Sequence, residues 1–190
     1  MTDELSADSD HGPASVLIIE DETELADMYA AYLPDDYDVE IAYGGEAGLE
    51  KLGDEYDLLL LDRRMPVVSG NEVLAALEER NLDCRVAMVT AIDPDFDIID
   101  LRIDDYLVKP VTRAELTGTV RRLLKLDEYN ERVNDLTSKK LKRNVLEVEK
   151  TQAELVDNPE FERLNREIAE LAQEVDELAR ELDIEDGPKV

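Results

Sequence analysis

Five short apolar runs, separated by stretches with helical periodicity, constrain the fold of this chain more than any other feature. The runs lie at 16–19, 39–42, 58–61, 86–89 and 106–108. Between them apolar residues recur at helical spacing, as at Val73, Leu74 and Leu77. Strands that alternate with helices form a parallel sheet with helices on both faces. The pattern therefore predicts an α/β domain.

Polar residues follow four of these runs at the point where each predicted strand ends. They are Glu20, Asp21, Asp62, Thr90 and Lys109. In an open parallel sheet the carboxyl ends of the strands lie along one edge, where ligands bind. If the first and third strands are neighbours, three carboxylates meet there.

Three adjacent carboxylates repel one another unless a cation lies among them, and oxygen ligands with open water positions suit Mg²⁺. A carboxylate nucleophile beside a divalent ion, the Thr90 hydroxyl and the Lys109 ammonium form a set that can receive a phosphoryl group. Simpler interpretations stay open for single residues. Asp62 can begin a turn, Glu20 and Asp21 can begin a helix, and Thr90 can be an ordinary hydroxyl at a strand end.

The segments that carry these residues read IIEDE, LLLLDRRMP with Gly70 downstream, MVTA and DDYLVKP. In this order, residues 16 to about 126 resemble the receiver domain of two-component response regulators. The resemblance implies a flavodoxin-like five-stranded parallel sheet with strand order 2-1-3-4-5.

The resemblance also implies roles for the residues at the strand ends. Asp62 is the phosphoacceptor. Asp21 and Asp62 ligate Mg²⁺ directly, Glu20 acts largely through water, and the backbone carbonyl of Arg64 supplies a further ligand. These roles make Mg²⁺ the expected cofactor.

For the phosphoryl group itself, the resemblance implies that Thr90 and Lys109 each contact one oxygen and that Tyr106 is an aromatic switch. The Lys109–Pro110 peptide bond is expected to be cis. The segment between Thr90 and Lys109 is a few residues shorter than is usual in this family. We therefore expect its helix to be short or irregular, which leaves the usual dimerisation surface in question.

Charge sets the environment in which such a chain can fold. The sequence has 49 acidic and 21 basic residues, a net charge of -28 that is spread along its length. Self-repulsion of this size is screened by concentrated salt, which indicates a halophilic protein. Cys84 is the single cysteine, so no internal disulfide can form. This is compatible with the cytoplasm, where we expect the protein to be.

The polar, acidic N-terminus is predicted to be disordered over residues 1–14. It does not resemble a signal peptide, and no apolar segment reaches the roughly 20 residues that span a bilayer, so no membrane partner is expected. His11, the only histidine, lies in this tail. Histidine-based catalysis and multi-histidine metal sites are therefore not expected.

Beyond the predicted receiver domain, a helix is expected to begin at Thr112, where Thr112 and Glu115 form a capping box. Neither Gly nor Pro occurs between Gly118 and Pro159. The apolar positions keep a heptad-like step up to Leu136 and then jump five residues to Leu141. This change of phase predicts a break or kink near Thr137 and Ser138.

Two heptad seams follow, at 141–155 and 161–182, separated by an Asp-Asn-Pro turn in which Asn158 caps the second helix. They predict an antiparallel α-helical hairpin, or coiled coil. The glutamates of the second arm that share one heptad position are Glu160, Glu167, Glu174 and Glu181. We expect them to face Thr137, Asn144 and Thr151 of the first arm.

This tail resembles the HalX module that follows receiver domains in halophilic archaea. The resemblance rests on the KKLKRNVLEVEKTQAEL helix, the DNP turn and the acidic heptad helix. The predicted organisation is a disordered tail over 1–14, a receiver domain over 15–126 and a HalX-like helical module over 127–186.

The leading hypothesis for function is a response regulator that accepts a phosphoryl group on Asp62 from a sensor histidine kinase and relays the change, through the helical module, to an unidentified output protein. A homodimer is left open. The alternative is a DNA-binding regulator that uses the basic cluster, namely Lys139, Lys140, Lys142 and Arg143. A hydrolase of small aspartyl-phosphate substrates is disfavoured because no lid or substrate domain is visible. We therefore expect phosphotransfer to itself and dephosphorylation, and no separate enzymatic activity.

Overall fold

The structure is a computed structural model that describes residues 12–92, 94, 96–156 and 158–182. Most of the predicted disordered tail, including His11, lies outside the described residues. The chain divides into two compact units, Met1–Leu124 and Lys125–Val190. Within the described ranges, no helix combines the length and the apolar character that crossing a membrane requires.

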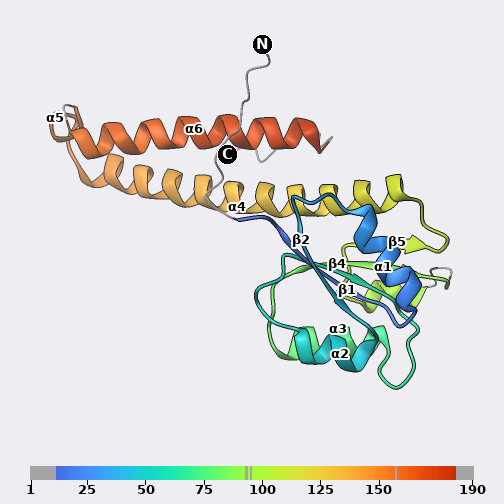
Figure 1. The fold of residues 1–190 in the computed structure, drawn as a ribbon. Helices are drawn as coiled ribbons and strands as arrows, with labels where there is room; N and C mark the ends of the chain where they lie inside the picture. The colour runs from blue at the N-terminus through green and yellow to red at the C-terminus, as the bar shows by residue number, and fades with distance from the viewer. Residues whose placement is uncertain (1–11, 93, 95, 157, 183–190) are drawn as a thin grey trace, which may run out of the picture. The chain divides into compact units, whose positions relative to one another are not determined.

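The first unit is built on a five-stranded parallel sheet (Figure 1). Its strands are β1 (Ser15–Ile19), β2 (Asp38–Ala42), β3 (Leu58–Leu61), β4 (Arg85–Thr90) and β5 (Asp105–Val108). The strand order is β2-β1-β3-β4-β5, and all four neighbouring pairs are parallel. The predicted flavodoxin-like sheet is confirmed.

Helices cover both faces of this sheet, because alternate residues of each strand point to opposite sides. Helices α2 (Gly45–Lys51) and α3 (Gly70–Glu79) pack on one face, where Leu17 and Ile19 of β1 are fully buried. Helix α1 (Thr23–Tyr32) and the first turns of α4 pack on the other face, against Val16 and Ile18. The central strands are therefore apolar on both sides.

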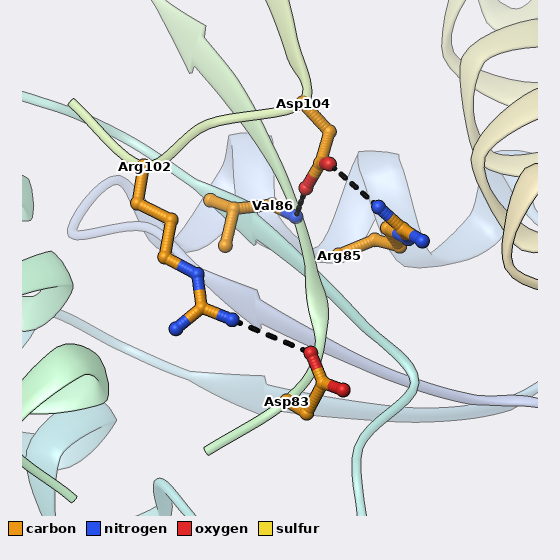
Figure 2. Close-up of polar contacts among 5 residues, drawn as sticks. All are labelled: Asp83, Arg85, Val86, Arg102 and Asp104. Atoms are coloured by element: carbon orange, nitrogen blue, oxygen red, sulfur yellow. Dashed lines mark hydrogen bonds and ion pairs between the residues drawn. The ribbon is translucent and has the colours of Figure 1, made fainter. Parts of the chain in front are cut away.

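In the described part of the connection between β4 and β5, the helical structure is the 3₁₀ helix η1 (Phe96–Asp100), which agrees with the short or irregular helix expected there. Asp104 anchors the end of this connection to the start of β4 (Figure 2). Its carboxylate lies 3.0 Å from Arg85 and accepts a 2.8 Å hydrogen bond from the backbone N–H of Val86. A second ion pair joins Arg102 to Asp83 at 3.3 Å. These contacts tie the residues before β5 to the start of β4.

Helix α4 runs without interruption from Arg113 to Glu149. The capping box that begins it is present, because the Thr112 backbone N–H donates to the Glu115 carboxylate at 2.8 Å and the Glu115 backbone N–H donates to the Thr112 hydroxyl at 3.3 Å. The predicted break near Thr137 and Ser138 was wrong. The five-residue jump in the apolar pattern turns the apolar stripe to another side of the helix and leaves the backbone helical.

The second unit is a helical hairpin that also contains α5 (Gln152–Leu155) and α6 (Pro159–Glu181). Asn158 caps α6 as predicted, because its side chain accepts hydrogen bonds from the N–H groups of Glu160 and Phe161. The predicted seam of α6 is buried, with Ile168, Leu171 and Val175 at its centre.

The partner of this seam differs from the prediction. Helix α6 packs on α4 through Tyr129, Val133 and Leu136, which lie before the expected first arm. Three of the four glutamates, Glu167, Glu174 and Glu181, face cations instead of the expected Thr137, Asn144 and Thr151. The ion pairs are Lys125–Glu181, Arg132–Glu174 at 3.3 Å and Lys139–Glu167 at 2.6 Å. They recur every seven residues on both helices and so fix an antiparallel register.

Candidate functional site

Asp62 lies directly after β3, at the carboxyl edge of the sheet, and its side chain is buried. Its backbone N–H donates to the carbonyl of Ile19 at 2.9 Å, which ties it to the end of β1. The loop that follows folds back tightly at Gly70. A Cβ atom there would lie 2.4 Å from the carbonyl oxygen of Asp62, so only glycine fits. This loop therefore fixes where the Asp62 carboxylate points.

Glu20 and Asp21 follow β1, the strand next to β3, and their carboxylates meet that of Asp62. One oxygen from each of the three side chains lies within 4.8 Å of the others. Glu20 is only 2% exposed, whereas Asp21 is the most open of the three. The structure thus brings the three predicted carboxylates together, because β1 and β3 are adjacent and end at the same level.

Lys109, directly after β5, supplies the positive charge of the site. Its ammonium lies 2.6 Å from Glu20 and 3.5 Å from Asp62. Burial raises the pKa of Glu20 above its usual value, and the ion pair with Lys109 only partly offsets this effect. Burial by itself would lower the pKa of Lys109, but the two carboxylates outweigh it and hold that pKa above its ordinary value. Lys109 is therefore charged at neutral pH.

Two buried oxygens at the site have no hydrogen-bond partner among the described residues. They are Oδ1 of Asp62 and the hydroxyl of Thr90, which ends β4 and is fully buried. A buried polar atom without a partner is costly, so these atoms indicate room for a ligand. Lys109 pairs with Glu20 and with Oδ2 of Asp62, whereas Oδ1 of Asp62 has no hydrogen-bond partner among the described residues. Three hard oxygen donors in this arrangement fit a divalent ion such as Mg²⁺.

The other predicted site residues lie around this centre. Arg64 lies two residues after Asp62 in the same loop, and its side chain is exposed. Tyr106, in β5, is half-buried, and its hydroxyl donates to the carbonyl of Ile92 at 2.9 Å. The peptide bond between Lys109 and Pro110 is cis.

The basic cluster predicted as a nucleic-acid contact belongs to the second unit, whereas the acidic site belongs to the first. Two of its members are engaged in ion pairs, Lys139 with Glu167 at 2.6 Å and Arg143 with Glu147 at 3.7 Å. Lys140 is half-buried, and Lys142 is exposed. Carboxylates therefore neutralise part of the charge that a phosphate backbone would need.

Sequence reasoning missed one feature of the Asp62 loop. Val67 has a φ angle of 68°, in the left-handed region that a β-branched residue rarely adopts. Its side chain is 79% exposed, so packing does not compensate for the strain. No pattern in the sequence signals it, because valine normally favours extended backbone.

The first unit is thus a doubly wound α/β domain with carboxylates, a lysine and a buried threonine at the carboxyl edge of its sheet, the arrangement expected of a receiver domain. The family model of the response regulator receiver domain matches residues 16–121, and that of the HalX domain matches residues 125–187. This chain belongs to the response regulator receiver family, and a HalX domain follows its receiver domain.

Individual proteins show the same relationship. A Haloferax volcanii protein named "Putative transcriptional regulator" is 51% identical over 110 residues, which cover 57% of this chain and 19% of that protein. The transcriptional regulatory protein CpxR of Escherichia coli is 34% identical over 120 residues, which cover 61% of this chain and 51% of CpxR. This chain therefore spans about half or less of these relatives, and the similarity lies in the receiver domain.

Solved structures agree with the fold. The N-terminal domain of a response regulator/sensory box/GGDEF protein from Carboxydothermus hydrogenoformans has a TM-score of 0.55 and 31% identity, covering 61% of this chain and 98% of that one. The response regulator TrrA of Thermotoga maritima, solved with Mg²⁺ and BeF, has a TM-score of 0.52 and 29% identity, covering 58% and 98%.

Proposed function

We propose that this protein is a response regulator of a two-component system, in which Asp62 accepts a phosphoryl group from a phosphohistidine of a sensor histidine kinase. The observation that carries the proposal is the meeting of Asp62 with Glu20, Asp21 and Lys109 at one buried edge of the sheet. Membership of the receiver family supports it.

In the transfer, a carboxylate oxygen of Asp62 attacks phosphorus while the bond from phosphorus to the histidine nitrogen breaks, and the imidazole leaves with its electron pair. Mg²⁺, when bound, would neutralise charge on the transferring group, and Asp21, Asp62 and the carbonyl of Arg64 would hold it, with Glu20 acting through water. Lys109 would pair with one phosphoryl oxygen. The unpartnered Thr90 hydroxyl would donate a hydrogen bond to another.

The test is phosphorylation by a small donor. Incubation with acetyl phosphate and Mg²⁺ should add one acid-stable, base-labile phosphoryl group, and Asp62→Asn should abolish it because an amide is not a nucleophile here. Asp36→Asn, which changes an exposed aspartate after α1, is the matched control and should label normally. Equal labelling of the Asp62→Asn protein would remove Asp62 from its assigned role.

For the output, we propose that the helical module relays the change to a protein partner. Helix α4 contributes Leu116, Val120 and Leu123 to the receiver core and Tyr129 and Leu136 to the hairpin core, so one helix belongs to both units. This continuity supports a mechanical connection between the domains.

DNA binding is the alternative, favoured by the names of the relatives that are transcriptional regulators. The ion pairs of Lys139 and Arg143 speak against it. A mobility-shift assay with genomic DNA fragments in molar KCl, with and without phosphorylation, decides between them. A shift that Lys140→Ala with Lys142→Ala removes would establish DNA as the output partner.

A further inference from the structure

Helix α4 carries an exposed apolar run in its last third. Leu141 and Val145 are each 61% exposed, and Val148 is 82% exposed. Their spacing of four and three residues places them on one side of the helix. Single exposed apolar residues are ordinary on a surface, but an aligned series of them indicates contact with another molecule.

The same side of α4 has no charge over residues 130–148. At 100° per residue, eight side chains fall within one third of the circumference. We call this face the uncharged stripe, and its members are Asn130, Asn134, Thr137, Ser138, Leu141, Asn144, Val145 and Val148. All charged residues of the segment lie elsewhere on the helix, although 37% of the chain is charged. Such separation of charged from uncharged side chains favours burial of this face against another molecule.

Helix α6 cannot cover the uncharged stripe. The ion pairs Arg132–Glu174 and Lys139–Glu167 fix the side of α4 that meets α6, and the apolar contacts through Val133 and Leu136 lie on that side. Leu141 follows Leu136 by five residues and is therefore turned about 140° from it around the helix. The stripe and the hairpin seam are two different faces of one helix.

We propose that the uncharged stripe is a dimer interface, in which it packs against the same stripe of a second copy of this chain. The heptad positions of the stripe are Asn130, Asn134, Thr137, Leu141, Asn144 and Val148, with spacing 4-3-4-3-4. An asparagine amide both donates and accepts hydrogen bonds, so asparagines from two copies can satisfy each other. Polar residues within a coiled-coil seam also select one register and one oligomeric state.

Charge favours a second copy as the occupant. The stripe has no charge that would select an acidic or a basic partner, and in an isologous contact it meets a face with the same pattern. Residues 113–150 have 7 acidic and 10 basic residues, whereas the whole chain has a net charge of -28. Two copies therefore repel each other least where this segment meets its equivalent. Contact through uncharged side chains also persists in concentrated salt.

The test is sedimentation equilibrium of the full chain in molar KCl. The fraction of wild-type chains found in dimers should rise with protein concentration. Val145→Asp places a charge in the stripe and should raise the dimer dissociation constant roughly 100-fold. Val156→Asp is the matched control, because Val156 is 60% exposed and lies outside the stripe, and it should leave the dimer unchanged.

Circular dichroism should give the same helix content for both variants, because each changes an exposed residue. The interface does not involve Asp62, so labelling by acetyl phosphate should persist in Val145→Asp. A wild-type chain that is monomeric at every concentration would overturn the proposal and assign the stripe to a different protein. A dimer that survives Leu141→Asp combined with Val145→Asp, or one that Val156→Asp disrupts equally, would also overturn it.

Discussion

The ammonium group of Lys109 lies 2.6 Å from the carboxylate of Glu20 at the edge of the sheet. Glu20 is 2% exposed, and the Lys109 side chain is 12% exposed, so water screens this pair weakly. Lys109 also lies 3.5 Å from Asp62 and is thus the counter-charge of two buried carboxylates.

Lys109→Gln should therefore lower the free energy of unfolding by about 3 kcal/mol in the absence of divalent ions, because it leaves buried carboxylates unpaired. Mg²⁺ should restore part of this loss by binding the folded state. Denaturant titrations with EDTA and with Mg²⁺ measure both effects. Lys51→Gln breaks the more exposed pair with Glu40 and should cost less than about 1 kcal/mol. Equal losses in the two variants would contradict the prediction.

Substitution of Val67 by glycine should stabilise the protein, since a φ angle of 68° strains any residue that has a Cβ atom. Val67→Gly relieves this strain and should raise the free energy of unfolding by about 1 kcal/mol, after the entropic cost of glycine. Val67→Ala keeps the Cβ atom and should gain less. Thermal unfolding of the three proteins tests the order, and a loss of stability in Val67→Gly would exclude strain at this position.

Tyr56 should make the free energy of unfolding depend on pH in the alkaline range. Its hydroxyl donates to the Glu40 carboxylate, and burial together with this bond raises the Tyr56 pKa well above its usual value. The folded state thus holds the phenolic proton more tightly than the unfolded state. The resulting stability is complete below about pH 10 and is lost as pH rises from there toward the folded-state pKa.

Tyr56→Phe should reduce the alkaline loss, to which Lys109 also contributes through its raised pKa, and at neutral pH it should cost about 1 kcal/mol for the missing hydrogen bond. Urea unfolding on either side of pH 10 measures the slope. Tyr37→Phe, which removes a different tyrosine, should retain the loss, and identical slopes in wild type and Tyr56→Phe would argue against the assignment.

Leu136 and Leu141 lie five residues apart on α4 and should respond very differently to truncation. Leu136 is 7% exposed in the hairpin core, so Leu136→Ala should cost the module about 2–4 kcal/mol. Leu141→Ala changes a side chain that is 61% exposed and should cost less than about 0.5 kcal/mol. Unfolding should be followed at a dilution where the chain is monomeric. A larger loss in Leu141→Ala than in Leu136→Ala would instead support the heptad seam predicted from the sequence, which begins at Leu141.

Folding should depend on salt, because a net charge of -28 opposes a compact state. At 1 M salt the screening length is about 3 Å, which removes most of this repulsion. Circular dichroism should show a folded protein in molar KCl and substantial loss of structure in dilute buffer. A thermal transition that does not change with KCl concentration would exclude a halophilic adaptation.

Local sequence patterns were sufficient to predict the parallel sheet and the residues at the carboxyl ends of its strands. Strand runs such as 58–61, and caps such as Thr112 with Glu115, act over a few residues, so a local pattern predicts them. The order of motifs, through family resemblance, then predicted that Asp21 and Asp62 would meet. The helix cap at Asn158 and the apolar seam of α6 were predicted for the same local reason.

Long-range packing determined whether α4 breaks or continues after Leu136, a point that helical periodicity leaves open. The apolar phase of α4 shifts after Leu136, and a shift of phase is compatible with either a break or an uninterrupted helix whose apolar face turns. The packing of the hairpin favours the uninterrupted helix, because Tyr129, Val133 and Leu136 already bury the seam of α6 and the ion pair of Lys139 with Glu167 extends the same register. The φ angle of Val67 and the 61% exposure of Leu141 are properties of the folded chain, because residue type alone fixes neither a backbone angle nor the burial of a side chain.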